Sequence, residues 1–175
     1  MEFEVKEELV ERIRDGDEEA FEEFAKLVTP KLYGAAFRML RDHDASEEVV
    51  QMTLIRFLEN SHRIKPKSVW GWLYRVLSNL ITDEFRRASK KAELKEEILK
   101  SASEDPQDAL CREDQKRILH AALGALGKKS RAVVLMRMDG FSYAEIAQQL
   151  GISEGSARVL FLKSIRKLSR EMGAA

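Results

Sequence analysis

The chain has 175 residues, enough for one large or two small domains with modest cores. Its 30 basic and 30 acidic residues cancel, but residues 1–65 carry 10 Lys/Arg against 16 Asp/Glu, and residues 128–175 carry 9 against 4. The basic end suits a nucleic acid and the acidic start suits a protein partner. A single Cys111 excludes an internal disulfide. No apolar run approaches 18 residues and no signal peptide is recognised, so we expect a cytoplasmic protein without membrane insertion.

Apolar residues recur at helical spacing nearly everywhere, and no stretch alternates as a strand does, which predicts an all-α fold. Asp17, Ser46 and Ser68 are residue types that cap helices, and Pro30 is expected to interrupt the second helix. In the first half of the chain we therefore expect helices over residues 4–14, 18–29, 32–40, 46–59 and 69–88.

Aromatic residues then vanish and charged residues dominate, with a run of helix breakers from Ser101 to Pro106. We take residues 91–108 as a charged linker between two small helical domains, residues 1–90 and 109–175. Residues 90–100 have enough helical propensity to extend the preceding helix. In the second domain, helices are expected at residues 118–126 and 133–138.

Residues 141–168 have the spacing of a helix-turn-helix. Gly151 permits a left-handed helix end and Ser153 can cap the next helix. An apolar face of the first helix is made by Ala144, Ile146, Ala147 and Leu150. In the second helix Ala157, Phe161, Ile165 and Leu168 lie on one side, and Arg158, Lys163, Arg166 and Lys167 lie largely elsewhere. Such a helix can enter a major groove, although a helical hairpin with a solvated basic face has the same pattern.

Two tryptophans, Trp70 and Trp72, follow a loop that carries Arg63, Lys65 and Lys67. Aromatic faces beside cations suit single-stranded DNA, because bases stack on the rings while cations hold the backbone. Residues two apart cannot share a helical face, so at most one tryptophan is expected to be exposed and the other to be core. Arg75, Asn79, Arg86 and Arg87 lie further along the same helix and add hydrogen-bonding and cationic groups.

The helix expected at residues 46–59 has a polar face formed by Glu47, Glu48 and Gln51. That face opposes the apolar set Val50, Thr53, Leu54 and Phe57. It can therefore offer carboxylates and an amide to a basic protein surface. The alternative is that the two glutamates only complement the helix N-terminus.

Enzyme signatures are absent from the sequence. His43, His62 and His120 are scattered, Cys111 is not at motif spacing from a histidine, and there is neither a phosphate-binding glycine loop nor a nucleophile elbow. We expect no catalytic residues, no metal site and no cofactor.

Five motifs in order cover almost the whole chain. They are Gly16-Asp17-Glu18-Glu19-Ala20-Phe21 with Pro30-Lys31-Leu32-Tyr33, Ser46-Glu47-Glu48-Val49-Val50-Gln51, Trp72-Leu73-Tyr74-Arg75 with Asn79-Leu80-Ile81-Thr82-Asp83-Glu84-Phe85-Arg86-Arg87, Tyr143-Ala144-Glu145-Ile146-Ala147, and Gly151-Ile152-Ser153-Glu154-Gly155-Ser156. Together they resemble the extracytoplasmic-function (ECF) sigma factors of the sigma-70 family, which are two-domain promoter-recognition subunits of bacterial RNA polymerase.

The resemblance implies a sigma region 2 bundle in residues 1–90 and a sigma region 4 helix-turn-helix in residues 109–175. The core RNA polymerase would be bound by Glu47, Glu48 and Gln51. The minus-10 element would be read and its opened strand captured by Arg63, Lys65, Lys67, Trp70, Trp72, Arg75, Asn79, Arg86 and Arg87. The duplex minus-35 element would be contacted by Ser153, Glu154, Ser156, Arg158, Val159, Leu162, Lys163 and Arg166. An anti-sigma factor is a further partner that the family resemblance leaves open.

Two parts of the sequence depart from the family pattern. Val159, Leu160 and Leu162 stand where the family usually has polar or basic residues, and Met52 stands where an acidic residue is common. Val159 or Leu162 could read a thymine methyl, contact an inhibitory partner, or belong to the core if the helix is rotated.

Two other function classes remain. A homodimeric helix-turn-helix repressor or activator of duplex DNA would leave the aromatic and basic residues of the first domain without a role. A pure interaction adaptor would explain acidic residues 1–65 but not the basic second helix. An initiation factor that leaves the chemistry to the polymerase accounts for both halves.

Overall fold

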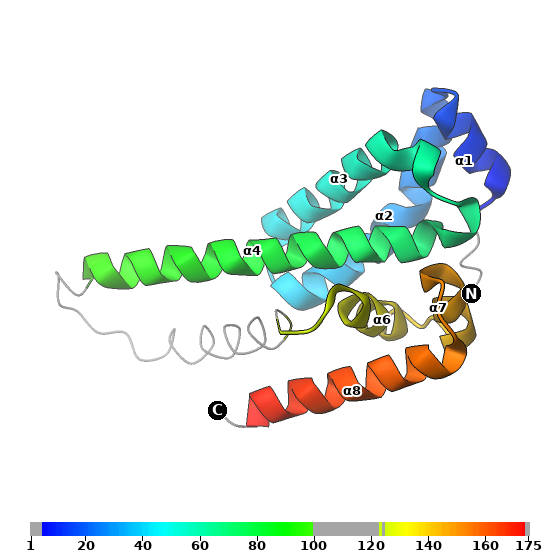
Figure 1. Ribbon diagram of the computed structural model, residues 1–175. Helices are drawn as coiled ribbons and strands as arrows, with labels where there is room; N and C mark the ends of the chain where they lie inside the picture. Colours follow the sequence, from blue (N-terminus) through cyan, green and yellow to red (C-terminus); the bar gives the residue numbers. More distant parts are fainter. Residues whose placement is uncertain (1–4, 100–122, 124, 174–175) are drawn as a thin grey trace.

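The computed structural model describes residues 5–99, 123 and 125–173. Within these ranges every regular element is helical, which confirms the all-α prediction (Figure 1). The elements are α1 (Glu7–Arg14), α2 (Glu18–Leu40), α3 (His43–Asn60), the short 3-10 helices η1 (Ser61–Arg63) and η2 (Pro66–Ser68), α4 (Val69–Leu99), α6 (Lys128–Met138), α7 (Tyr143–Leu150) and α8 (Glu154–Gly173).

Helices α1 to α4 form the first helical group, in which α3 packs on both α2 and α4. Phe24 and Phe57 are fully buried and stack with their ring centroids 4.3 Å apart, which joins α2 to α3. Asp17 begins α2 as expected, because its carboxylate accepts a hydrogen bond from the Ala20 backbone N–H at 3.0 Å. That bond and the nearby Arg12 lower the pKa of Asp17.

Helices α6, α7 and α8 form the second group, and α7 and α8 make the expected helix-turn-helix. Ser142 and Glu145 form a reciprocal capping box at the start of α7. Gly151 ends α7 with φ of 64°, the left-handed backbone that its sequence position predicts. Ser153 then accepts a hydrogen bond from the Ser156 backbone N–H at 3.1 Å, so the predicted cap of α8 is confirmed.

The two groups pack directly against each other along α4 (Figure 1). Trp70 and Tyr74 of α4 contact Phe141, with ring centroids 5.9 Å and 5.6 Å from it. The Gly71 backbone N–H donates to the Gln149 side-chain oxygen at 3.1 Å. The buried apolar residues of both groups therefore form one continuous core.

Some predicted helix boundaries are wrong. Pro30 lies inside α2, which continues to Leu40, because the buried Val28 and Leu32 on either side anchor one unbroken helix and offset the cost of proline. Helix α3 begins at His43 with Asp42 as its cap, and Ser46 is instead a buried residue within the first turns.

Two predictions of burial are also wrong. Ile165 is exposed and its place on the inner face of α8 is taken by Ser164, whose hydroxyl donates to the Leu160 carbonyl at 2.7 Å. This bond explains how a serine is accommodated in the core. Ala144 is exposed, so the buried face of α7 consists of Ile146, Ala147 and Leu150.

Helix α4 continues to Leu99, into the segment predicted as a linker. Residues 100–122, which include the breaker run and Cys111, lie outside the described residues, as does most of the helix expected at residues 118–126. The division into domains at residues 1–90 and 109–175 stays a prediction.

Gly71 provides a test of the contact between the groups. A Cβ at this position would lie 2.7 Å from the Gln149 carbonyl carbon, too close for α7 to keep its place. We expect Gly71→Ala to separate the groups and increase the radius of gyration in small-angle scattering, while leaving α4 helical because alanine favours a helix over glycine. Gly155→Ala is the matched control, since a Cβ there meets nothing within 4 Å. A Gly71→Ala scattering profile identical to that of the wild type would contradict the contact.

Candidate functional site

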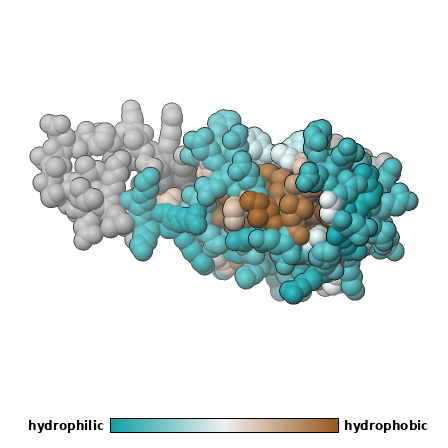
Figure 2. Space-filling model, turned by 90° about the horizontal axis from the view of Figure 1, so that it is seen from above, coloured by the Kyte–Doolittle hydropathy of each residue, from teal (hydrophilic) through white to brown (hydrophobic). Residues whose placement is uncertain are grey.

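Helix α3 presents an exposed face that combines acidic and apolar groups. The predicted residues Glu47, Glu48 and Gln51 are all exposed. Met52, Ile55 and Leu58 are exposed beside them, and Ile55 keeps 48% of its surface. Figure 2 shows the apolar patch in the middle of the face seen from above, surrounded by hydrophilic side chains. We call these six residues the α3 face.

The apolar half of the α3 face was not predicted. The sequence pattern predicts a single apolar side, formed by Val50, Thr53, Leu54 and Phe57, and the structure buries three of these residues and half-buries Leu54. Met52, Ile55 and Leu58 recur three apart, as helix neighbours do, so a second apolar face was detectable. An exposed apolar patch with a polar rim is typical of a protein-binding surface.

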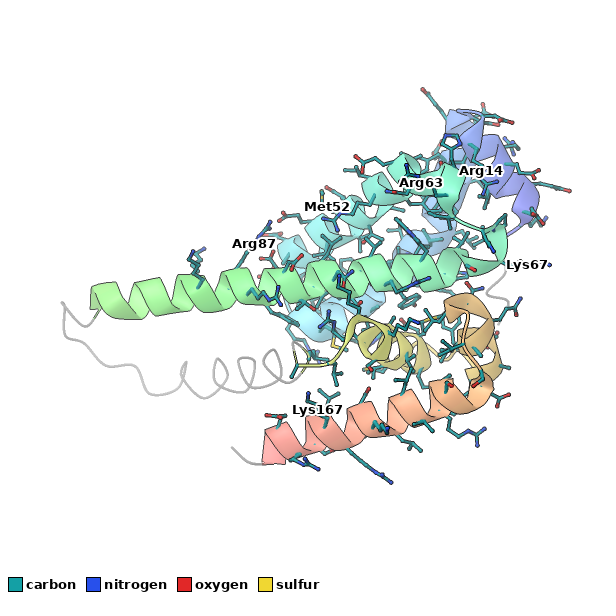
Figure 3. The ribbon with its side chains drawn as sticks, viewed as in Figure 1. Arg14, Met52, Arg63, Lys67, Arg87 and Lys167 are labelled. Atoms are coloured by element: carbon teal, nitrogen blue, oxygen red, sulfur yellow. The ribbon has the colours of Figure 1, made fainter. Side chains whose placement is uncertain are left out.

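The basic loop lies between α3 and α4, where Arg63, Lys65 and Lys67 are all exposed. Arg14 of α1 holds this loop, because its guanidinium donates to the backbone carbonyls of Ser61 at 3.1 Å and Ile64 at 2.6 Å. Figure 3 shows Arg14, Arg63 and Lys67 at this end of the first group. Arg14 is a positioning residue that the sequence analysis missed.

The two tryptophans lie on opposite sides of α4, as their spacing predicts. Trp70 is only 2% exposed and packs against Phe141 of the second group. Trp72 is half-buried, and its ring meets Phe57 edge-on with centroids 6.1 Å apart. Trp70 is therefore the core residue of the pair, and Trp72 is the more exposed one.

The other predicted minus-10 residues are spread along α4. Arg86 and Arg87 are exposed, and Arg87 lies 3.8 Å from the Glu48 carboxylate of the α3 face. Arg75 is half-buried and donates to the Gly71 carbonyl at 3.2 Å.

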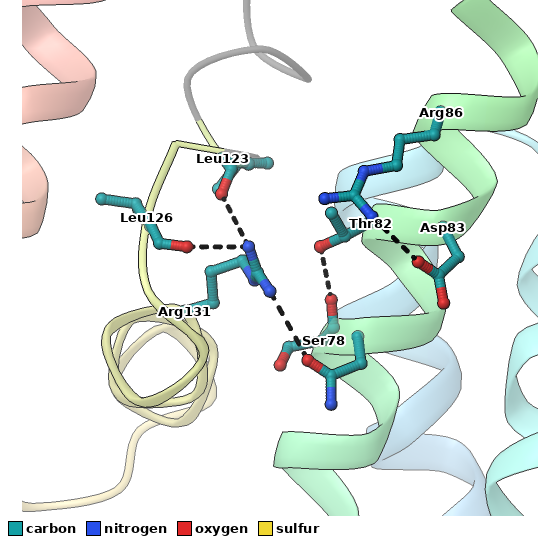
Figure 4. Close-up of polar contacts among 8 residues, drawn as sticks. Ser78, Thr82, Asp83, Arg86, Leu123, Leu126 and Arg131 are labelled. Carbon is teal, nitrogen blue, oxygen red and sulfur yellow. Dashed lines mark hydrogen bonds and ion pairs between the residues drawn. The ribbon is translucent and has the colours of Figure 1, made fainter. Parts of the chain in front are cut away.

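Asn79 faces the second group and accepts a hydrogen bond from Arg131 at 3.5 Å. Arg131 also donates to the carbonyls of Leu123 and Leu126 (Figure 4), and burial lowers the pKa of Arg131. The structure therefore does not bring all the predicted minus-10 residues to one surface, because Trp70 and Asn79 lie between the groups.

Every residue predicted for the minus-35 contact is exposed, on α8 or, for Ser153, at the cap before it. These residues are Ser153, Glu154, Ser156, Arg158, Val159, Leu162, Lys163 and Arg166. Val159 and Leu162 keep 48% and 47% of their surface, so the hypothesis that they are core residues of a rotated helix is wrong. Arg158 pairs with Glu154 at 3.2 Å and its guanidinium lies 5.1 Å from the centroid of the Tyr143 ring.

A carboxylate joins the two groups. Asp139, at the end of α6, accepts hydrogen bonds from Arg38 of α2 and from the Tyr74 hydroxyl of α4, the latter at 2.6 Å. Burial and the negative charge of Asp139 raise the pKa of Tyr74. We call Arg38, Tyr74 and Asp139 the inter-group latch. No local signal predicts it, because Met138-Asp139-Gly140 reads as an ordinary helix end.

Comparisons with known proteins identify the family. Residues 10–91 match the family model for sigma-70 region 2, and residues 116–168 match that for sigma-70 region 4. The chain is 31% identical over 168 residues to the RNA polymerase sigma factor CarQ of Myxococcus xanthus, covering 94% of this chain and 95% of CarQ. The chain belongs to the ECF sigma factors of the sigma-70 family.

A second relative of this ECF sigma factor is the ECF RNA polymerase sigma factor SigE of Mycolicibacterium smegmatis, 32% identical over 151 residues. That match covers 82% of this chain and 59% of SigE, so the chain spans about three fifths of that relative. The solved structure of CnrH in complex with the cytosolic domain of CnrY shares the fold, with a TM-score of 0.58, 21% identity and coverage of 95% and 96% of the two chains.

The family places sigma region 2 in the first helical group and sigma region 4 in the second. Sigma factors are non-catalytic initiation factors, in agreement with the sequence analysis. In the part of the chain that the structure describes, no helix is long and apolar enough to cross a membrane, and no three His, Cys, Asp or Glu side chains gather as metal ligands would.

Removing the Tyr74 hydroxyl tests the latch. Tyr74→Phe leaves the carboxylate of Asp139, which is largely buried, without one of its two donors, and we expect unfolding free energy to fall by about 1–3 kcal/mol in urea titrations. Tyr33→Phe is the matched control, because the Tyr33 hydroxyl contacts His43 at an exposed position. Equal losses in the two variants would contradict a stabilising role for the latch.

Proposed function

We propose that this ECF sigma factor binds core RNA polymerase through the α3 face, reads the minus-35 element with α8, and captures the opened minus-10 strand with the basic loop and α4. The observation that carries the proposal is the separation of three exposed surfaces on one chain. One is acidic and apolar, and two are basic.

The α3 face suits the polymerase because its chemistry is that of a protein interface. Ile55 and Leu58 supply an apolar centre, and Glu47 and Glu48 supply charges at one end. Interfaces with this arrangement gain affinity from the desolvated centre and orientation from the charged rim. Carboxylates of this kind fit a cationic surface such as the one that the family resemblance implies on the polymerase clamp.

The basic loop and α4 suit an unpaired strand. Lys65 and Lys67 are free to meet phosphates, and Arg63 extends from the same loop. Trp72, in the first turn of the helix that follows the loop, leaves part of its ring exposed, and a base can stack there. Arg75, Arg86 and Arg87 then continue a cationic path along α4.

Helix α8 suits duplex DNA because its exposed side is cationic. Lys163 and Arg166 are exposed, and Arg158 lies near the start of the helix. We assign Lys163 and Arg166 to phosphate contacts and Arg158 to a base edge, which it reaches on release from Glu154.

Promoter binding requires the two helical groups to separate. Elements centred at minus-35 and minus-10 are about 25 base pairs apart, or roughly 85 Å at a rise of about 3.4 Å per pair. Helix α8 packs beside α6 and α7, which contact α4, so α8 cannot reach one element while α4 meets the other. We call the arrangement in which the two groups pack together the closed form. We propose that polymerase first binds the α3 face, which is exposed in the closed form, and that the hydrogen bonds of the latch then break. Separation of the two groups exposes Trp70.

The remaining expectations follow from this role. The chain acts in the cytoplasm with the polymerase, which performs the nucleotidyl transfer, and needs no active site or cofactor of its own. An anti-sigma factor that stabilises the closed form would inhibit it.

The alternative is a homodimeric regulator that binds closed duplex. Reconstitution with core polymerase and a promoter library separates the two. The proposal predicts promoter-specific transcripts and an opened region. Tight binding to palindromic duplex as a dimer, with no opened region on any promoter, would favour the regulator instead.

A charge placed on the α3 face tests polymerase binding. We expect Ile55→Glu to weaken binding to core polymerase at least tenfold, because a carboxylate replaces the apolar centre of the interface. The measurement is competition of labelled wild-type chain for core polymerase. Met138→Glu is the matched control, since Met138 is exposed on α6 away from the α3 face. Equal binding by Ile55→Glu and the wild type would contradict this assignment.

Truncation of Trp72 tests strand capture. We expect Trp72→Ala to reduce permanganate-reactive thymines around minus-10, because stacking offsets about 1–3 kcal/mol of the cost of unpairing a base. Binding of the minus-35 duplex should persist. Trp72→Phe keeps much of the packing against Phe57 and controls for misfolding. Full strand opening by a folded Trp72→Ala protein would contradict the role.

A further inference from the structure

The exposed face of α8 has an apolar centre. At about 3.6 residues per turn, Gly155, Val159, Leu162 and Arg166 fall along one line of the helix. The line lies opposite the buried Ala157 and Ser164 and is exposed throughout. Val159 and Leu162 therefore occupy the position that enters a groove most deeply.

Cations surround this centre. The exposed cations of α8 are Arg158, Lys163, Arg166, Lys167 and Arg170. Of the two carboxylates on α8, Glu154 pairs with Arg158 and Glu171 lies at the far end. The partner must therefore be polyanionic at its rim and apolar at its centre.

Arg158 does not occupy the centre. Its ion pair with Glu154 and its place over the Tyr143 ring direct it to the edge of α8 beside α7. The two aliphatic side chains are thus the groups that meet the floor of a groove first. Aliphatic groups cannot hydrogen-bond, so they discriminate only between apolar and polar base edges.

The major groove of duplex DNA fits this combination. Phosphates line its rims, and the thymine C5-methyl is the apolar group on its floor. Val159 and Leu162 lie three residues apart, about 4.5 Å along the axis. Successive base pairs are about 3.4 Å apart, so the two side chains reach neighbouring pairs.

We infer that Val159 and Leu162 are specificity-determining residues that read the C5-methyl groups of thymines in neighbouring base pairs of the minus-35 element. This inference rests on the proposed role of α8 and adds which chemical group it recognises. Hydrogen-bonding side chains at these positions would read other bases, so the departure from the family pattern alters promoter choice.

The experiment replaces thymine by uracil, which removes the methyl group and keeps every hydrogen-bonding group. Promoters are first selected from a random library with the full chain and core polymerase. Each upstream thymine is then changed to uracil in turn, and holoenzyme binding is measured by competition. We expect binding about threefold to fivefold weaker at one or two adjacent positions, the effect of one buried methyl group.

Variants connect the effect to the side chains. Val159→Ala and Leu162→Ala, each checked for helicity by circular dichroism, should each become insensitive to uracil at one position. Ile165→Ala is the matched control, because Ile165 is an exposed aliphatic residue on the flank of the same helix, and its uracil sensitivity should equal that of the wild type.

Three outcomes would overturn the inference: selected upstream elements without thymine, tolerance of uracil at every position, or unchanged uracil sensitivity in both variants. The second shows that no thymine methyl is read, and the third shows that a side chain other than Val159 and Leu162 reads it. Each presupposes promoter-specific transcription by the wild type. Failure of that transcription would contradict the proposed function itself, so the two failures are distinguishable.

Discussion

Helix α4 packs against α2 and α3 of the first group and against α6 and α7 of the second, and this shared packing holds the two groups together. One side of the helix packs Trp72 toward Phe57, and the other side packs Trp70 and Tyr74 against Phe141. Burial of these aromatic rings attracts the two groups to each other without fixing their orientation. The latch fixes the orientation, because the largely buried Asp139 carboxylate accepts hydrogen bonds from donors on two different helices of the first group.

The same packing divides the functional surfaces into covered and uncovered ones. The α3 face and the outer side of α8 are exposed in the closed form, whereas Trp70 and Asn79 lie between the groups. Under the proposed function, polymerase binds the α3 face before the two groups separate. The free energy of polymerase and promoter binding then offsets the loss of the inter-group contact, and the closed chain cannot bind both promoter elements at once.

Local features of the fold were predictable because they depend on neighbouring residues. The cap at Ser153 and the helix end at Gly151 are set by backbone geometry within a turn, and the opposite sides taken by Trp70 and Trp72 follow from their spacing. The latch was not predictable, because Arg38 and Asp139 are 101 residues apart. The burial of Ser164 in place of Ile165 was likewise not predictable, because it depends on how α8 packs against other helices, and the spacing of apolar residues along one helix does not reveal that packing.

The proposed function requires polymerase and promoter to convert the closed chain to an open one. The distance between spin labels at Glu11 of α1 and Ser169 of α8, both exposed, reports on this change once Cys111 is replaced by serine. We expect a single distance in the free chain and an increase of tens of ångströms in the promoter complex, because the promoter elements lie far apart. The same distance in the free chain and in a complex that transcribes from the promoter would show that the groups do not separate.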